Sequence, residues 1–535
     1  MIPGRSSLLM PHRKDNLQRL SAAVKGLNIF DGLVVAICAA SFVFSVIESV
    51  VNYDNLHWGW AYIAALDLKR GAFPHSEVII FYGYIYTLLQ SFALHVFGER
   101  LISVGIVTGL FYSVTLLLSY RIFLRFLKKN LAFIAVLFIF LIHPYIIYPA
   151  PNYFAYAFQL LALLLFLKYP ENRNFGLAAG FFLGMAVLSR YSSVAALVTP
   201  FIILLGRDFF IAKKRDERVI PKVILVGAGF LIPVSLFLGY LLLNSALDDF
   251  FYQNVILVKT IGRGGDIETY ANFLASVLQI VPSYASDFRG KMFTFILFIC
   301  LLMMIRTVIR KPKDEPGMPD CRSYDILAVC LITVFGFLNS MHVYETFRLV
   351  NGVSLGVGLC VLVFYHAFIT SGKPLKYILA FGGIAIFVWL SSSLLFTQTT
   401  SAYYPWQKDI FCGKGVADSR IPLLTGKIMT KEYNDFYQEI FDAVEPYKKN
   451  YYILNYTRDL VAFVLNDLPR IQISPVNIQG IDDISHQVKL IETKKAVILS
   501  YKPLDFPGYR PIFKKRWPDE IPWLGGGLLF IYAPQ

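Results

Sequence analysis

The chain has 535 residues, of which 56% are hydrophobic and only 16% are charged, and its formal net charge is +14. Soluble proteins carry about 25% charged residues, so this composition excludes an ordinary soluble fold. The basic residues are spread through short loops between apolar runs. They therefore predict an orientation in a membrane rather than a nucleic-acid partner. The six cysteines have no metal-ligand spacing and indicate no disulfide framework.

The apolar runs recur along the chain, and a run of about 20 residues is enough to cross a membrane. They predict a polytopic α-helical membrane protein with about 11 spans, within a range of about 10–13. The pair at 175–188 and 194–205 could also form one long helix. The predicted spans are 30–51, 101–120, 131–148, 153–167, 175–188, 194–205, 223–243, 292–305, 326–338, 349–368 and 377–396.

We divide the chain into three parts: a basic cytoplasmic arm (1–29), a multi-span domain (30–396) and an extracytoplasmic α/β domain (397–535). The division follows from the positive-inside rule, because every strongly basic loop then lies on the cytoplasmic side. The protein is expected in the inner (plasma) membrane with its N-terminus in the cytoplasm. In the last part, 451–455, 495–500 and 528–533 are predicted strands and 457–465 a predicted helix.

The first outer loop, residues 52–99, combines acids and histidines with many aromatic side chains. Residues 57–70 predict an interfacial amphipathic helix whose side chains Trp58, Trp60, Tyr62 and Ile63 suit the headgroup level. Residues 78–97 are apolar enough to span. We place them in the outer interface instead, because a span there would put the basic loop 121–129 outside. Ionisable residues so close to a membrane span predict a functional site.

Several short motifs carry a family resemblance. The first outer loop contains four motifs that resemble those in the first outer loop of the GT-C glycosyltransferases. It is closest to the branch that uses polyprenyl-phosphate sugars, such as protein O-mannosyltransferases and lipid A aminoarabinose transferases. The segments 180–193 and 450–469 also resemble parts of that family. The first-loop motifs are Tyr53-Asp54-x-x-His57, Gly71-Ala-Phe-Pro74, Tyr82-Gly83 and Phe97-Gly98.

The resemblance implies a catalytic carboxylate at Asp54, which would act as the general base or orient the acceptor hydroxyl. Many relatives have two adjacent acids here, whereas this chain has Asp54-Asn55. Relatives also often have an acid in the second outer loop, where this chain has Asn152. A mechanism with one carboxylate is therefore expected, with no cofactor, although a divalent metal is left open.

The implied reaction transfers a sugar from a polyprenyl-phosphate donor to a lipid, glycan or protein acceptor on the outer face. Cations must then neutralise the charge that develops on the lipid phosphate. For Arg190 and Arg348, snorkelling to the headgroups is nearly as good an interpretation, whereas Arg263 lies in a glycine-rich stretch that could be a lid or only a loop. His57 could orient Asp54 or only cap its helix, and Glu77 is the reserve carboxylate. The candidate substrate-binding residues are His57, Glu77, Tyr82, Asn152, Arg190, Arg263, His342 and Arg348.

Two other classes of protein stay open. A polysaccharide polymerase or ligase that acts on lipid-linked glycan would also work on the outer face, and would rely more on outer-loop arginines than on a first-loop aspartate. A secondary transporter would place ionisable residues near the middle of the bilayer, often with internal repeats. The notable charges here lie at the outer ends of spans and no repeat is visible, so a transporter is the weaker alternative.

Overall fold

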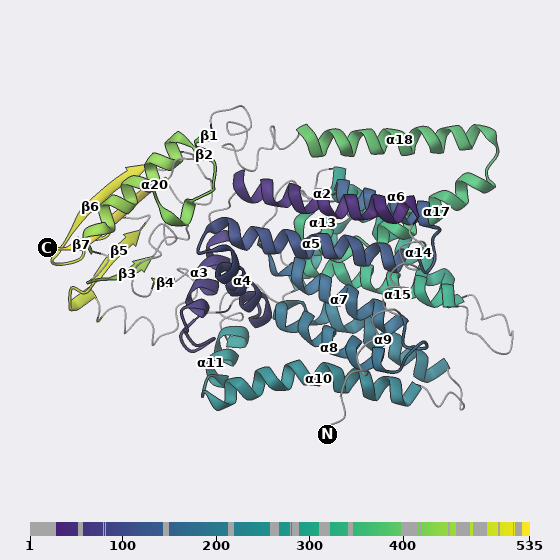
Figure 1. Ribbon diagram of the computed structural model, residues 1–535, viewed down its shortest axis with the longest axis horizontal. Coiled ribbons are helices and arrows are strands. Elements are labelled where there is room, and N and C mark those ends of the chain that lie inside the picture. Colours follow the sequence, from purple (N-terminus) through teal and green to yellow (C-terminus); the bar gives the residue numbers. More distant parts are fainter. Residues whose placement is uncertain are drawn as a thin grey trace, which may run out of the picture.

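The computed structural model shows a helical bundle with an α/β part at one end (Figure 1). The structural statements below concern the residues that it describes. These are 28–51, 57–78, 80, 82–142, 149–211, 219–256, 267–278, 280, 288–309, 321–340, 346–396, 415–416, 420–447, 450–455, 471–473, 489, 491–500, 503–516, 518 and 527–535.

Within these ranges, seven helices are long and apolar enough to cross a membrane, and four shorter apolar helices accompany them. Together they occupy the 11 positions predicted as spans. The chain is therefore a multi-pass membrane protein. The helices are α2 (Ile29–Val51), α5 (Leu101–Phe123), α6 (Lys129–Ile142), α7 (Pro151–Leu167), α8 (Asn174–Ser189), α9 (Val194–Ile211), α10 (Val219–Leu243), α14 (Phe288–Ile309), α15 (Cys321–Gly336), α17 (Gly356–Thr370) and α18 (Lys373–Phe396).

One predicted span differs in form from the expectation, and one open alternative is resolved. The tenth is broken into α16 (Thr346–Val353) and α17. The pair that could have been one helix is two, because Arg190 is extended (φ −153°) between α8 and the short helix η1 (Tyr191–Ser193). Both breaks lie near the end of the bundle that carries the first loop. At each break, backbone N–H and C=O groups lose the hydrogen bonds that a continuous helix would make.

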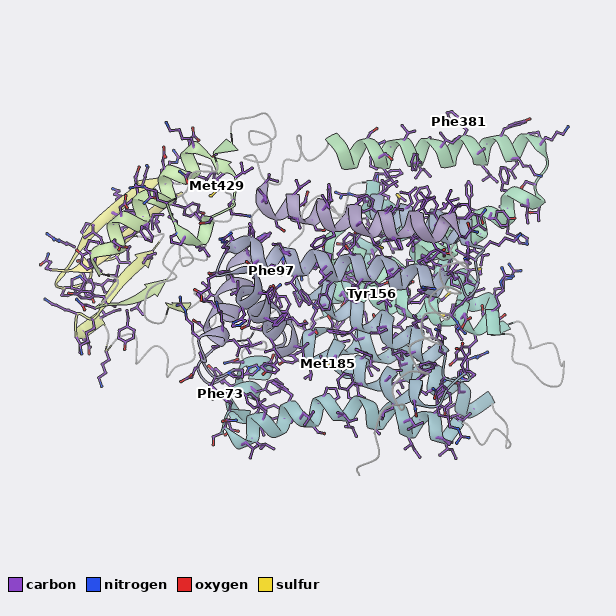
Figure 2. All side chains as sticks on the ribbon, viewed as in Figure 1. Phe73, Phe97, Tyr156, Met185, Phe381 and Met429 are labelled. Carbon is purple, nitrogen blue, oxygen red and sulfur yellow. The ribbon has the colours of Figure 1, made fainter. Side chains whose placement is uncertain are left out.

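Helices α8 and α10 pack closely because glycines line their contact. A side chain at Gly180 would collide with the backbone of Val226, and one at Gly229 would collide with the backbone of Leu177. Small residues allow two membrane helices to approach until their backbones touch. The outermost helix is α18, where Phe381 projects away from the bundle (Figure 2) and is 75% exposed, as suits a lipid-facing side chain.

The first loop forms two helices, α3 (His57–Lys69) and α4 (Tyr84–Phe97). The predicted interfacial setting of α3 is wrong. Trp58, Tyr62 and Ile63 are buried in the main hydrophobic core rather than turned toward headgroups. The helix carries apolar residues on all sides and packs against α4, which explains its burial. Helix α4 is not among the candidate spans, in agreement with its predicted place outside the spans.

The connection between α10 and α14 contains the short helices α11 (Leu247–Phe251), η2 (Tyr252–Ile256) and α13 (Ile267–Val277). Helix α15 is continued by η3 (Phe337–Ser340). In Figure 1, α11 lies at the end of the bundle where the α/β part also lies, and Phe250 of α11 packs against His75 of the first loop. The first loop and the C-terminal part thus share one end, as the alternation of the predicted spans requires.

The C-terminal part is an α/β unit. Its five-stranded sheet has the order β4 (Ile471–Ile473), β3 (Tyr452–Asn455), β5 (Ala496–Ser500), β7 (Leu528–Pro534) and β6 (Tyr509–Arg516). Strands β4, β3 and β5 are parallel, and β7 is antiparallel to β5 and β6. The three predicted strands are present as β3, β5 and β7, whereas the predicted helix at 457–465 lies outside the described residues. The other elements are β1 (Gly415–Val416), β2 (Met429–Thr430), η6 (Pro422–Leu424), α20 (Lys431–Val444) and η7 (Glu445–Tyr447).

A short segment of this unit docks on the end of α2. The Lys427 ammonium donates to the Ser49 carbonyl oxygen at 2.7 Å, and the Ile428 amide donates to the Val50 carbonyl oxygen at 2.9 Å. These carbonyls belong to the last turn of a helix, which has no internal donors left for them. Met429 lies at this junction (Figure 2). The docking therefore fixes the α/β unit where the first loop begins.

Candidate functional site

The structure leaves several predicted site residues without a described position. Asp54, Arg263 and His342 lie outside the described residues. His57 begins α3, but its side chain is likewise not described. What can be located for Asp54 is the helix before it. Helix α2 ends at Val51, against the docked segment of the C-terminal part.

Arg190 is a buried cation between α8 and α9, only 5% exposed. Its Nε donates to Ser192 Oγ and its Nη2 to the Asn339 carbonyl oxygen, both at 3.4 Å. Its Nη1 is buried and has no hydrogen-bond partner among the described residues. Burial and the nearby charge of Arg348 lower the pKa of Arg190 to about 9, so the guanidinium is still charged at neutral pH. A buried cation with a donor to spare is suited to an anionic ligand.

Tyr82 is held beside Arg190 by the backbone. The Tyr191 amide donates to the Tyr82 carbonyl oxygen at 2.8 Å, and the Tyr84 amide donates to the Tyr191 hydroxyl at 2.9 Å. Gly83 is required between them, because a side chain there would collide with the backbone of Leu188 and Ser189. The Tyr82-Gly83 motif thus joins the first loop to the end of α8.

Arg348 and Asn351 extend this group from the first turns of α16. They are three residues apart on one helix, a spacing that places side chains on the same face. Arg348 lies close enough to Arg190 for their charges to interact, and Asn351 is hydrogen-bonded to Tyr153 of α7. The structure therefore brings Tyr82, Arg190 and Arg348 together from three distant segments. We call Glu48, Tyr82, Asn152, Tyr153, Arg190, Arg348 and Asn351 the polar cluster.

Asn152 joins the cluster from the start of α7. Its neighbour Pro151 occupies the first turn, where a missing N–H costs nothing. Asn152 is 5% exposed, and its Nδ2 has no hydrogen-bond partner among the described residues. The adjacent Pro149 carbonyl accepts a short hydrogen bond from the Tyr86 hydroxyl, which ties α4 to this turn. An amide donor is thus available where relatives often have an acid.

The sequence analysis missed Glu48, an acid in the last turns of α2 that is only 2% exposed. Its charge interacts with Tyr153. The missed signal was the acid itself, because a carboxylate within an apolar span is a functional candidate by default. Its location makes it the one described carboxylate of the polar cluster.

Glu77 lies outside the polar cluster and has a structural role in a turn of the first loop. Glu77 is exposed, and its Oε2 accepts a hydrogen bond from the Phe73 amide at 2.8 Å, so it closes the turn between Phe73 and Val78. The neighbouring His75 is 2% exposed and has a positive φ of 70°. Its Nδ1 donates to Gln253 Oε1 at 2.8 Å. This pair joins the first loop to η2, a link that no local sequence pattern indicates.

No group of three or more histidine, cysteine, aspartate or glutamate side chains that could hold a metal ion occurs in the described part of the chain. The polar cluster combines one carboxylate and two guanidinium groups with tyrosine and asparagine side chains. Such a set can neutralise and hydrogen-bond a phosphate and can orient a hydroxyl.

Comparison with known protein families gives one match. Residues 83–240 match the family described as dolichyl-phosphate-mannose-protein mannosyltransferase. The match includes Asn152 and Arg190 and begins one residue after Tyr82. The match agrees with the resemblance predicted from the sequence: this segment is similar to membrane glycosyltransferases that use a lipid-phosphate sugar.

Two solved structures illustrate what the chain is similar to. The oligosaccharyltransferase of Archaeoglobus fulgidus, tethered to an acceptor peptide, is 12% identical with a TM-score of 0.47, over 87% of this chain and 69% of that one. ArnT from Cupriavidus metallidurans, bound to undecaprenyl phosphate, is 11% identical with a TM-score of 0.49, over 87% of this chain and 92% of that one. The comparison with curated proteins gave no match.

Proposed function

We propose that the protein transfers a sugar from a polyprenyl-phosphate donor to a hydroxyl of a lipid, glycan or protein acceptor, at the end of the bundle that carries the first loop. The observation that supports this most is the pairing of Arg190 and Arg348 beside Tyr82. Arg190 is buried, and a second positive charge close to it costs free energy that a bound anion would offset. A lipid phosphate is the anion that this class of enzyme must hold.

The chemistry assigns a role to each side of the polar cluster. The phosphate leaves with the electron pair of its bond to the sugar C1, and Arg190 and Arg348 neutralise the charge that develops there. The lipid phosphate is a good leaving group, so no strong general acid is needed. Tyr82 and Asn152 would hydrogen-bond the donor. The acceptor oxygen attacks C1 and gives its proton to a carboxylate.

Asp54 is our candidate for that carboxylate. It follows the end of α2 directly, and α2 also carries Glu48 into the polar cluster. The chain therefore leaves the membrane beside the proposed phosphate site and reaches Asp54 within a few residues. His57, Arg263 and His342 remain further candidates for substrate binding. A role for a divalent metal stays open.

The proposed orientation places the polar cluster on the extracytoplasmic face of the inner (plasma) membrane. The basic connections after α5 and α7 lie at the other end of the bundle, where the positive-inside rule expects the cytoplasm. With the N-terminus inside, residues 397–535 form an extracytoplasmic domain. Accessibility of single introduced cysteines to a membrane-impermeant reagent tests this orientation.

The central experiment compares the purified wild type with Asp54→Asn in sugar transfer from a panel of polyprenyl-phosphate sugars to a membrane lipid extract. We expect a loss of about a hundredfold or more for Asp54→Asn, since general base catalysis contributes roughly that factor. Asp249→Asn is the matched control, because Asp249 is an exposed acid on α11. It should retain wild-type activity and the same unfolding temperature.

Full activity of Asp54→Asn would refute Asp54 as the base and direct attention to Glu48 and Glu77. A wild type that is inactive with every monosaccharide donor, yet transfers an assembled lipid-linked glycan, would support the polymerase or ligase alternative instead. The arginines of the polar cluster would serve that reaction as well.

A further inference from the structure

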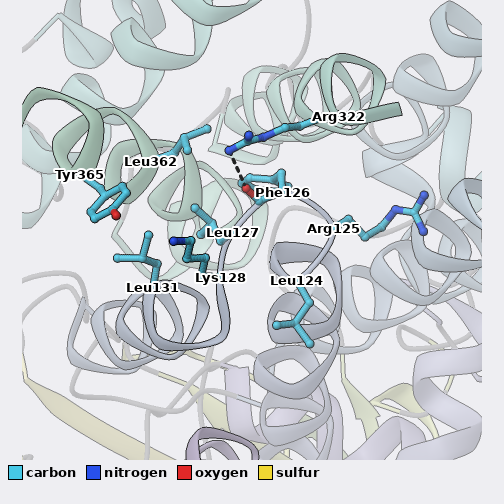
Figure 3. Close-up of a pocket in the computed structure, with 9 residues that line it drawn as sticks. All are labelled: Leu124, Arg125, Phe126, Leu127, Lys128, Leu131, Arg322, Leu362 and Tyr365. Carbon is cyan, nitrogen blue, oxygen red and sulfur yellow. Dashed lines mark hydrogen bonds between the residues drawn. The ribbon is translucent and has the colours of Figure 1, made fainter. Parts of the chain in front are cut away.

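A second polar site lies at the end of the bundle opposite the polar cluster. It is a pocket with a cavity volume of about 310 Å³, formed by the turn after α5, the start of α6, the first turn of α15 and the second half of α17 (Figure 3). Its walls combine cationic side chains with leucines, and no acidic residue of the described part of the chain lines it. The proposed glycosyl transfer makes no use of this pocket.

Two cations of the pocket are available to a ligand. Arg322 donates from Nη2 to the Phe126 carbonyl oxygen at 3.1 Å, which holds its guanidinium at the rim. Lys128 is exposed, and its ammonium is turned toward Tyr365 (Figure 3). Neither has a carboxylate partner among the described residues. The guanidinium of Arg125 points away from these groups in Figure 3, because it pairs with Asp325 at 3.0 Å.

The rest of the pocket is suited to the boundary between headgroups and acyl chains. Leu131 and Leu362 form apolar walls, and the Tyr365 hydroxyl supplies a polar group beside Lys128. The pocket lies where α5 ends and α6 begins, at the ends of membrane-crossing helices, which is the level of lipid headgroups. Basic pockets between membrane helices bind phosphate headgroups in this setting.

We propose that this pocket binds the phosphate of an anionic membrane phospholipid, with Lys128 and Arg322 as its ligands and the acyl chains along the leucine walls. The absence of an acidic residue from the lining is the reason to favour an anionic lipid. A zwitterionic headgroup would bring an ammonium next to two cations with no carboxylate to receive it. The site is independent of the sugar-transfer chemistry and can be tested without an activity assay.

The test titrates the full-length protein in detergent with dioleoyl phosphatidylglycerol and follows binding by native mass spectrometry and by the unfolding temperature. Dioleoyl phosphatidylcholine is the same-chain control, and inorganic phosphate is the headgroup-free control. The test variant is Lys128→Gln with Arg322→Gln. The matched control is Arg173→Gln with Lys373→Gln, which removes two exposed cations from the same end of the bundle but outside the pocket.

We expect phosphatidylglycerol to bind and stabilise the wild type, and the test variant to bind it about 25-fold more weakly, since each cation near a membrane surface contributes roughly a factor of five. The control variant should bind phosphatidylglycerol with an affinity within about twofold of the wild type. Equal binding of phosphatidylcholine would overturn the anionic lipid, and equal stabilisation by inorganic phosphate would reduce the pocket to a simple anion site. An equal loss in both double variants would show a diffuse charge effect and refute the pocket.

Discussion

Arg190 illustrates how burial turns an ordinary span-end arginine into a candidate ligand. The sequence left snorkelling to headgroups as an equal explanation, and the structure removes it, because the side chain is 5% exposed and bonded to the Asn339 backbone. Arginine differs from lysine in presenting a planar set of donors that matches a phosphate. Its position on the chain was predictable, but its burial depended on α8, α9 and η3 meeting around it.

We predict that Arg190→Gln lowers kcat/KM for the polyprenyl-phosphate donor by about a hundredfold to a thousandfold, because one charge-stabilising donor contributes about that factor. Arg190→Lys should recover only part of the loss, since the ammonium cannot reproduce the planar donors. Steady-state rates with a fixed acceptor provide the measurement. An unchanged kcat/KM in a folded Arg190→Gln would exclude this arginine from the phosphate site. Arg173→Gln, an exposed arginine at the other end, is the control.

His75 predicts a pH dependence of stability. Burial lowers the pKa of His75 to about 4, although the bond to Gln253 favours the charged form. The unfolded chain has the usual pKa of about 6.5, so it takes up the proton first as the pH falls. The free energy of unfolding should therefore decrease between pH 6.5 and 4, by up to roughly 3 kcal/mol.

The unfolding temperature in detergent from pH 7.5 to 4.5 tests this prediction for the wild type and for His75→Asn. The variant has no titrating ring, so its unfolding temperature should fall less over this range. Parallel curves for the two proteins would show that other groups cause the loss. Gln253→Leu should weaken the link between the first loop and η2 while leaving the ring in place.

At the scale of elements, the contact between α8 and α10 depends on glycines that leave room for backbone. We predict that Gly180→Ala destabilises the protein by about 1–3 kcal/mol, because the added methyl group collides with the Val226 backbone and pushes the helices apart. Gly227→Ala is the matched control on α10, since nothing lies within 4 Å of the added atom. Thermal unfolding of both variants measures the difference in stability. Equal stability of the two would contradict the close packing.

The broken helices place two cations of the polar cluster at helix ends. Arg190 has extended backbone after α8, and Arg348 lies in the first turn of the short helix α16. Irregular backbone inside a membrane protein is tolerated only where it is buried in protein or lines a polar site. The sequence shows the apolar runs but not which ends face one another, so the breaks became meaningful only in three dimensions.

At the scale of the whole molecule, the junction between the bundle and the α/β unit depends on Lys427. The side chain is 1% exposed, its Nζ lies 4.4 Å from the Trp58 ring centroid, and burial lowers its pKa well below the usual value. A cation–π contact of this kind contributes about 2 kcal/mol when water is excluded. The ammonium therefore joins α2, α3 and the C-terminal unit at one point.

We predict that Lys427→Met loosens this junction, because methionine retains much of the apolar stem but neither the bond to Ser49 nor the contact with Trp58. Hydrogen exchange at residues 422–430 should rise by about tenfold or more, and thermal stability should fall. Lys431→Met, at an exposed position at the start of α20, should leave exchange unchanged. Exchange equal to wild type in Lys427→Met would show that the apolar contacts suffice for docking.

The sequence by itself determined the class of the molecule. Apolar runs fix which segments can enter a membrane, and loop charge fixes how they alternate, so the 11 helical positions and the shared end of the first loop and the α/β part followed from composition and spacing. The three predicted strands of the C-terminal part followed in the same way. These features depend on local sequence, so each segment can be predicted from its own residues.

Tertiary structure decided everything that depends on segments meeting. The burial of α3 could not be read locally, because aromatic side chains suit both a headgroup layer and a protein core. Glu48, Arg190 and Arg348 lie in three separate segments of the chain, and His75 contacts Gln253 across a wide separation in the sequence. Sequence periodicity records which face of a helix is apolar but not which neighbour covers it. The polar cluster therefore forms only in the packed bundle, where the exclusion of water strengthens the interactions between its charges.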